Sequence, residues 1–172
     1  MLCDLGHIGE TLHRLGKAGD GLVSVLLAIE KVCPWALPTV IGAFMPFLVM
    51  TGMHYCFAPI QTIQYATLGY GTILGPGMLA SNIAQGTASL MVGLRTKNKN
   101  LKELSLSSGF TALMGITEPA LYGVNLKLKK PLYAAVIGGG AAGLFAGLTH
   151  LHTYSSTTAG LLALAFMGFS GL

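Results

Sequence analysis

Charged side chains are scarce in this chain. Asp, Glu, Lys and Arg make up 9% of its 172 residues, against about 25% in an average soluble domain. None of the four occurs between Val32 and Leu94 or between Pro131 and Leu172, and each stretch exceeds the roughly 20 residues that span the hydrocarbon core of a bilayer. The shortage of charge argues against a water-soluble domain and predicts an all-α, polytopic transmembrane protein.

Several features of soluble and secreted proteins are missing as well. The three cysteines lie at unrelated spacings, which argues against a disulfide framework. There is no P-loop, no Gly-x-Ser-x-Gly motif and no Cys-x-x-Cys motif, so an ATPase, an α/β-hydrolase and a thioredoxin-type enzyme are not leading hypotheses. His150 and His152 form a His-x-His pair without a third ligand nearby, and we therefore expect no metal ion and no other cofactor.

The positive charge is concentrated in two short loops. Seven of the ten Lys and Arg residues fall between Arg95 and Lys130, in the stretches RTKNKNLKE and KLKK. Short basic loops stay on the cytoplasmic side of a membrane, so we expect a cytoplasmic face here and no nucleic-acid partner. If both loops lie on that face, the segment Leu104–Leu126 enters and returns as a re-entrant hairpin. The alternative is that the segment crosses the membrane once, which would place one of the two basic loops on the non-cytoplasmic side in spite of its charge.

Glycine and proline divide the rest of the sequence. Residues 1–21 are polar and predict a solvated or interfacial lead-in, followed by a membrane domain over residues 22–172. Four prolines in residues 33–60 predict a broken helix, and GYGTILGPG predicts a turn between two helical segments in residues 60–94. Polar side chains of these segments should face the interior of the bundle, because lipid cannot satisfy them; they are Gln61, Gln64, Asn82, Gln85 and Thr87.

A further spanning helix is predicted from Pro131 onwards. Its residues Gly139, Gly143 and Gly147 recur every four positions, which puts them on nearly one face, where another helix can approach closely. The apolar sequence after residue 159 stops short of another span, so we expect part of a larger membrane domain.

The sequence contains only two carboxylates beyond Lys31, Glu103 in a basic loop and Glu118 in GITEPALYG. Helix-breaking and apolar residues surround Glu118. A charge at membrane depth costs at least about 2.5 kcal/mol, so Glu118 is a candidate functional residue. The alternative is that it caps broken backbone amides beside Pro119.

Three other polar residues are candidates for binding a substrate. His54 lies in the uncharged stretch MTGMHYCFAPI, where it is either a satisfied core residue or a partner of Glu118 at a cavity between broken segments. Asn82 and Gln85, three residues apart on one helical face, are suited either to binding hydroxyl groups or to bonds between helices.

These motifs carry a family resemblance. The stretch SSGFTALMGITEPALYGVNLKLKKPLYAAVIGGG resembles the GITEP region of the membrane-embedded IIC domain of bacterial phosphoenolpyruvate-dependent sugar phosphotransferase permeases, in the glucose superfamily. PFLVMTGMHYCFAPI and GPGMLASNIAQGTASLMVGLRTKNKNLKELS resemble preceding parts of that domain, most closely in the β-glucoside, sucrose and trehalose branch. The resemblance covers residues 36–148.

The resemblance implies a multi-pass permease of the bacterial cytoplasmic (inner) membrane. Such a domain binds a sugar and presents it to a phosphocysteine on a IIB domain. The IIB cysteine receives its phosphoryl group from a IIA phosphohistidine, which upstream phosphocarrier proteins supply. Glu118 and His54 match family residues that contact sugar hydroxyls, and Thr117 joins them as a binding candidate. Glu118 is also the catalytic candidate, because its carboxylate could assist proton removal. Members of the family form homodimers.

The chain also departs from the family pattern. A complete IIC domain has about ten membrane spans, whereas this chain has room for about five or six apolar segments, and it has neither the phosphocysteine nor the phosphohistidine region. We therefore expect the C-terminal half of a IIC domain, with a β-glucoside as the leading substrate. Two alternatives remain: a secondary transporter or channel fragment that uses Glu118 as a proton or cation site, and a structural membrane subunit.

Overall fold

The computed structural model describes part of the chain, namely residues 33, 35–71, 74–154 and 160–169. The predicted polar lead-in over residues 1–21 lies outside this part.

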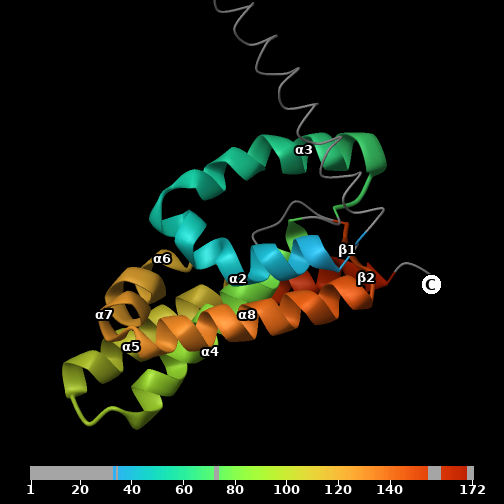
Figure 1. Ribbon diagram of the computed structural model, residues 1–172. Helices are drawn as coiled ribbons and strands as arrows, with labels where there is room; N and C mark the ends of the chain where they lie inside the picture. Colours follow the sequence, from blue (N-terminus) through green and yellow to red (C-terminus); the bar gives the residue numbers. More distant parts are fainter. Residues whose placement is uncertain (1–32, 34, 72–73, 155–159, 170–172) are drawn as a thin grey trace, which may run out of the picture.

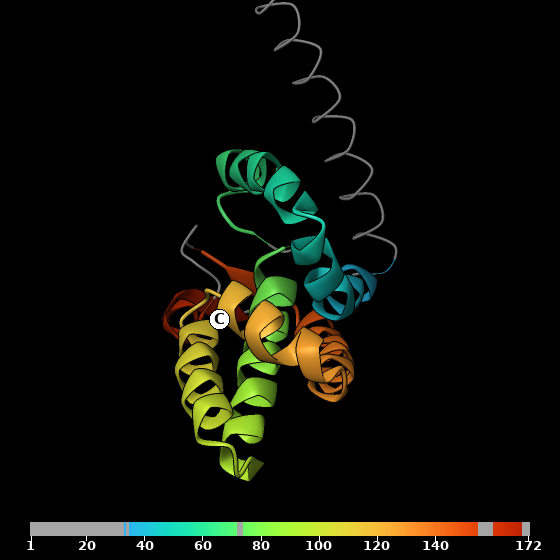
Figure 2. The same ribbon diagram turned by 90° about the vertical axis from the view of Figure 1, so that its left-hand side faces the viewer.

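Three helices form the centre of the molecule: α2 (Ala36–Met50), α4 (Gly75–Arg95) and α8 (Lys130–Leu148). They lie side by side (Figure 1 and Figure 2), and α5 (Lys99–Leu113) packs along α4. The helix α3 (Phe57–Leu68) stands apart from this centre in both views. The predicted all-α class is confirmed.

A small antiparallel pair of strands is the exception to the helical pattern. β1 (Leu151–Thr153) pairs with β2 (Met167–Phe169), which follows the short helix η3 (Leu161–Phe166). Gly71 bridges to Thr153 through two backbone hydrogen bonds of 2.7 and 2.8 Å. The sequence analysis did not predict these strands, because three residues are too few for an alternating pattern to stand out.

The predicted broken helix is present, but a glycine marks the break. α2 is followed by the short helix η1 (Met53–Cys56) and then by α3. Gly52 between α2 and η1 has a φ of 72°, a left-handed conformation that glycine adopts without steric cost. Pro46, in contrast, is buried inside α2 and does not end it. The turn predicted between residues 60 and 94 is also found, since α3 ends at Leu68 and α4 begins at Gly75.

Glycines allow α8 to contact the backbone of α2. A Cβ atom added to Gly139 would collide with the carbonyl oxygen of Gly42, and one added to Gly143 would collide with the carbonyl oxygen of Pro38. Gly147 meets the backbone of Trp35 in the same way. The predicted face of close approach is therefore confirmed, and the structure identifies α2 as the helix that packs on it.

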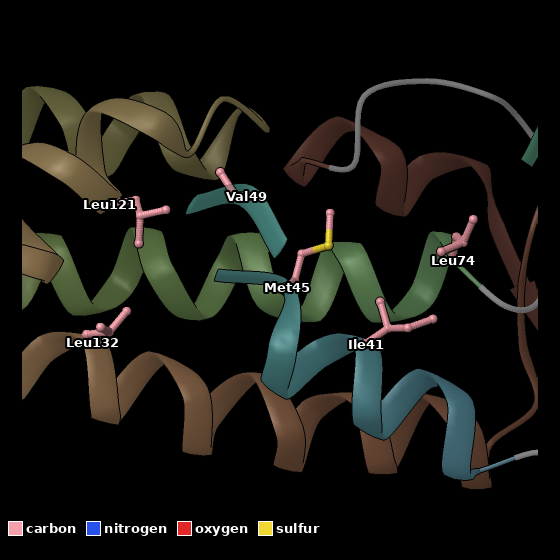
Figure 3. Close-up of a cluster of buried hydrophobic side chains, with 6 residues drawn as sticks. All are labelled: Ile41, Met45, Val49, Leu74, Leu121 and Leu132. Carbon is pink, nitrogen blue, oxygen red and sulfur yellow. The ribbon is translucent and has the colours of Figure 1, made fainter. Parts of the chain in front are cut away.

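A cluster of buried apolar side chains joins the central helices to the segment after Glu118. In Figure 3, Leu121 and Leu132 lie at one end of the cluster, Met45 and Val49 of α2 in the middle, and Ile41 of α2 with Leu74 at the other end. Leu121 is completely buried. In a bilayer such contacts act through close van der Waals packing rather than through escape from water, so their fit decides how firmly this segment is held.

The chain between the two basic loops folds back on itself. After α5 come three short helices, α6 (Glu118–Ala120), the π-helix η2 (Leu121–Asn125) and α7 (Leu126–Leu128). A Cβ atom added to Gly123 of η2 would lie 3.6 Å from the side chain of Leu104 in α5, so the returning segment packs on the outgoing one. Arg95 and Lys130, at the two ends of the hairpin, line the same groove. This arrangement supports the re-entrant hairpin, whose position in a membrane stays a prediction.

One described helix is long and apolar enough to cross a membrane. That helix is α8, whose 19 residues extend about 28 Å at 1.5 Å per residue, close to the roughly 30 Å of a bilayer core. α2 is a shorter apolar helix. The structure therefore has one helix of spanning length and composition among the described residues, and the multi-pass arrangement stays a prediction.

Candidate functional site

The segment that carries Glu118 begins with a tight turn. α5 ends at Leu113, and Gly115 has a φ of 106°, a conformation in which side chains other than that of glycine are strained. The amide of Gly115 donates a hydrogen bond of 3.0 Å to the carbonyl of Ala112. The chain therefore changes direction just before Thr117 and Glu118.

Glu118 is half-buried at the start of α6, and Thr117 directly before it is buried. Within the part of the chain that the structure describes, the Glu118 carboxylate makes no hydrogen bond and no ion pair. The interpretation of Glu118 as a cap for backbone amides near Pro119 consequently gains no support. Its oxygens are open to a hydroxyl donor from outside the chain.

His54 lies on η1, beyond the break that ends α2. Its ring packs against that of Tyr55, with 4.1 Å between the ring centroids. The Nδ1 atom of His54 is buried and has no hydrogen-bond partner among the described residues. A buried polar atom left unpaired costs about 1–3 kcal/mol, so His54 does not behave as a satisfied core histidine.

A tertiary hydrogen bond joins the end of α2 to the segment after Glu118. The hydroxyl of Tyr122 in η2 donates a hydrogen bond of 3.4 Å to the carbonyl of Val49, near the end of α2. In Figure 1, α6 lies below the turn between α2 and α3. No direct hydrogen bond joins His54 to Glu118 among the described side chains, and their convergence on one site stays a prediction.

A π-helix follows Glu118. The wider turns of a π-helix are often found at functional sites, and η2 is held in place by Asn125, which is completely buried. The Nδ2 atom of Asn125 donates a hydrogen bond of 3.2 Å to the main-chain carbonyl of Gln85 in α4. The sequence analysis missed both Tyr122 and Asn125; the signal for Asn125 is an amide within an apolar stretch that also contains Glu118.

Asn82 and Gln85 are both buried on α4, as predicted for polar side chains of an inward face. The Nε2 atom of Gln85 donates to the hydroxyl of Ser81, at 3.2 Å. Its Oε1 atom is buried and has no hydrogen-bond partner among the described residues, which leaves one acceptor for a further donor. The bond from Asn125 involves only the Gln85 main chain, so both interpretations of the Gln85 side chain remain.

The inward orientation is wrong for one of the five predicted residues. Thr87 is exposed, and its hydroxyl donates to the carbonyls of Ile83 and Ala84 in its own helix, at 2.8 and 3.1 Å. A threonine can satisfy its hydroxyl in this way without any other helix, so a threonine is weaker evidence for an interior face than an amide. Gln64 is completely buried and Gln61 is half-buried.

The histidines near the end of α8 lie in a different region. The ring of His152 packs against that of Tyr70, with 4.9 Å between the centroids, and His150 is exposed. No group of three or more His, Cys, Asp or Glu side chains that could hold a metal ion is found in the described ranges.

The structure has a groove of about 680 Å³ that none of the five candidate residues lines. Residues of α4 and α8 form most of its lining, which also includes Leu101 of α5 and Leu128 of α7, and Arg95 and Lys130 belong to the lining. The grouping of Glu118, Thr117, His54, Asn82 and Gln85 into one binding site therefore stays a hypothesis, supported by the unpaired atoms described above.

The profile of one protein family, described as "Phosphotransferase system, EIIC", matches residues 12–140. This chain belongs to the EIIC family. The match includes α2, α4, α5 and the Glu118 segment, and it ends within α8. No solved structure matches the chain.

Curated relatives of this EIIC chain are phosphotransferase-system components of several specificities. It is 51% identical, over 107 residues, to the "PTS system beta-glucoside-specific EIIBCA component" of Bacillus subtilis (strain 168), a match that covers 62% of the chain and 17% of that protein. It is 39% identical, over 83% of its length, to the arbutin-, cellobiose- and salicin-specific EIIBC component of Escherichia coli (strain K12), and covers 30% of that protein.

A third relative extends the match over more of this EIIC chain. The sucrose-specific EIIBC component of Bacillus subtilis (strain 168) is 35% identical over 92% of the chain, which covers 35% of that relative. The chain thus spans between 17% and 35% of the length of these three relatives.

Proposed function

We propose that this chain forms part of a sugar permease in a bacterial cytoplasmic membrane. It would bind a sugar and present it to a phosphocysteine on a IIB domain, which receives its phosphoryl group from IIA. The family assignment supports a membrane role, and the names of the relatives join B, C and in one case A components in one protein.

A β-glucoside is the proposed substrate class. Support comes from the 51% identity to the beta-glucoside-specific relative, compared with 35% identity to the sucrose-specific relative. The first of these matches includes fewer residues, 107 against 162, and sucrose is therefore the first alternative to test.

The proposal for the sugar-binding site rests on the unpaired polar atoms of His54 and Glu118. A sugar hydroxyl would donate to the Glu118 carboxylate, and His54 Nδ1 would bond a second hydroxyl, so the substrate would satisfy atoms that the protein leaves unpaired. Thr117, Asn82 and Gln85 are proposed as further binding residues. During transfer, the S–P bond of the phosphocysteine breaks as the sugar oxygen bonds to phosphorus, the thiolate leaves, and Glu118 takes the hydroxyl proton.

The replacement Glu118→Gln tests this role, because it removes the proton acceptor and keeps the size of the side chain. In vesicles carrying the intact system, we expect phosphoenolpyruvate-dependent sugar uptake to fall by about 100-fold or more, with the amount of protein unchanged. Glu103→Gln is the matched control, since Glu103 is an exposed carboxylate on α5 and its loss should leave uptake as it is.

Two outcomes would contradict the proposal. Normal uptake by the Glu118→Gln protein would remove Glu118 from the site. Accumulation of unphosphorylated sugar that follows the proton gradient would instead identify a secondary transporter.

A further inference from the structure

The groove between α4 and α8 is separate from the proposed sugar site. It has a volume of about 680 Å³, and its walls are mostly apolar or small. The residues of α4 that line it recur at helical spacing along one face, and α8 supplies the opposite wall. The lining residues used below are Ala84, Ala88, Met91, Arg95, Lys130 and Gly138.

The length of the groove matches one leaflet of a bilayer. From Ala84 to Arg95 the wall formed by α4 extends about 17 Å, at 1.5 Å per residue. Half of a hydrocarbon core of about 30 Å is about 15 Å. An acyl chain lying along α4 would therefore have its headgroup near Arg95.

The end of the groove at Arg95 is positively charged. Arg95 and Lys130 both line it and are exposed, and no acidic side chain is part of the lining. α8 also begins here, at Lys130, and the side chain of the preceding Lys129 makes no capping hydrogen bond. The positive end of the helix dipole adds to the attraction for an anion, although Pro131 in the first turn offers no N–H.

We propose that this groove binds an anionic phospholipid of the cytoplasmic leaflet. Its phosphate lies between Arg95, Lys130 and the N-terminus of α8, and one acyl chain lies between α4 and α8. Basic pockets between membrane helices are suited to such headgroups. A lipid fits the observed lining because it supplies an apolar chain and a negative charge at the spacing of these walls. The proposal does not depend on which sugar the permease carries.

Lipid selectivity measured on the full-length chain tests the proposal. The chain is reconstituted with spin-labelled phosphatidylglycerol or phosphatidylcholine, and electron spin resonance gives the immobilised fraction of each lipid. In the double variant Arg95→Gln, Lys130→Gln, we expect the preference for phosphatidylglycerol over phosphatidylcholine to fall by about 10- to 30-fold. Each of the two substitutions removes about one charge contact with the lipid phosphate. The control, Lys97→Gln with Lys102→Gln, removes the same charge from exposed residues outside the groove and should retain the preference.

A second variant tests the apolar part of the groove. A Cβ atom added to Gly138 would lie 3.6 Å from the Cβ of Ala84, an ordinary contact, so Gly138→Leu should fold and fill the groove. We expect it to reduce the immobilised fraction of both lipids.

Several results would overturn the proposal. Equal effects of the double variant and its control would show that only overall charge matters. An unchanged immobilised fraction in Gly138→Leu would leave a phosphate site without an acyl chain, and competition by glycerol phosphate would identify a soluble anion as the ligand. Absence of any immobilised lipid would show that protein covers the groove.

Discussion

At the scale of single residues, His54 illustrates how an unpaired atom can point to a substrate. Only Nδ1 of its two ring nitrogens is buried without a partner among the described residues. The two nitrogens can be distinguished by substitution, because the amide of Asn lies near the position of Nδ1 and that of Gln reaches toward the position of Nε2. The structure therefore makes a prediction about one atom rather than about one residue.

We expect His54→Asn to retain sugar binding better than His54→Gln. One hydrogen bond of about 1.4 kcal/mol corresponds to a tenfold change in affinity, so the KM for sugar uptake should rise about tenfold more in His54→Gln. His54→Phe, which retains a ring to pack against Tyr55, separates this effect from stacking and should resemble His54→Gln. The reverse order of the Asn and Gln variants would exclude Nδ1 as the contact atom.

At the scale of secondary structure elements, the contact between α2 and α8 depends on the absence of side chains at particular positions. Gly138 and Gly139 are neighbours in α8, yet their surroundings differ. A Cβ atom at Gly139 would collide with the backbone of Gly42, whereas one at Gly138 would make an ordinary contact with Ala84. The two positions form a matched pair in which helix propensity changes equally.

Gly139→Ala should destabilise the protein and Gly138→Ala should not. The first change forces α2 and α8 apart, at a cost of about 1–3 kcal/mol, partly offset by the higher helix propensity of Ala, about 1 kcal/mol. The second gains the propensity without the collision. Unfolding by denaturant in detergent should therefore place the Gly139→Ala midpoint clearly below that of Gly138→Ala. Coincident midpoints would mean that α2 and α8 do not touch along this face.

At the scale of the whole molecule, the hairpin formed by α5 to α7 returns the chain to the side from which it left. Arg95 and Lys130 then share one groove, and the two basic loops lie at the same end of α4 and α8. α8 extends from this end over about 28 Å to Leu148, far enough to reach the opposite side of a bilayer.

Cysteine labelling tests this topology in a background without the native cysteines. Lys97→Cys and Lys129→Cys should both react only from the cytoplasm, whereas His150→Cys, beyond the other end of α8, should react only from outside. Lys97 is preferable to Asn98 because the Asn98 side chain caps α5 through the amides of Asn100 and Leu101. Labelling of Lys97→Cys and Lys129→Cys from opposite sides would replace the hairpin with a membrane span.

The sequence by itself determined the helical class, the turn before α4 and the glycine face of α8. Each of these depends on local composition or on a spacing of four residues, which a single segment contains in full. The position of the first break was harder to predict, because both proline and glycine can end a helix. In the structure the break lies at Gly52, and Pro46 is contained within α2.

Only the tertiary structure decided which elements meet around Glu118. Tyr122 bonds to Val49, 73 residues away, and Asn125 bonds to Gln85, 40 residues away. Neither local propensity nor spacing contains such information, because a hydrogen bond between distant residues depends on where packing brings each backbone.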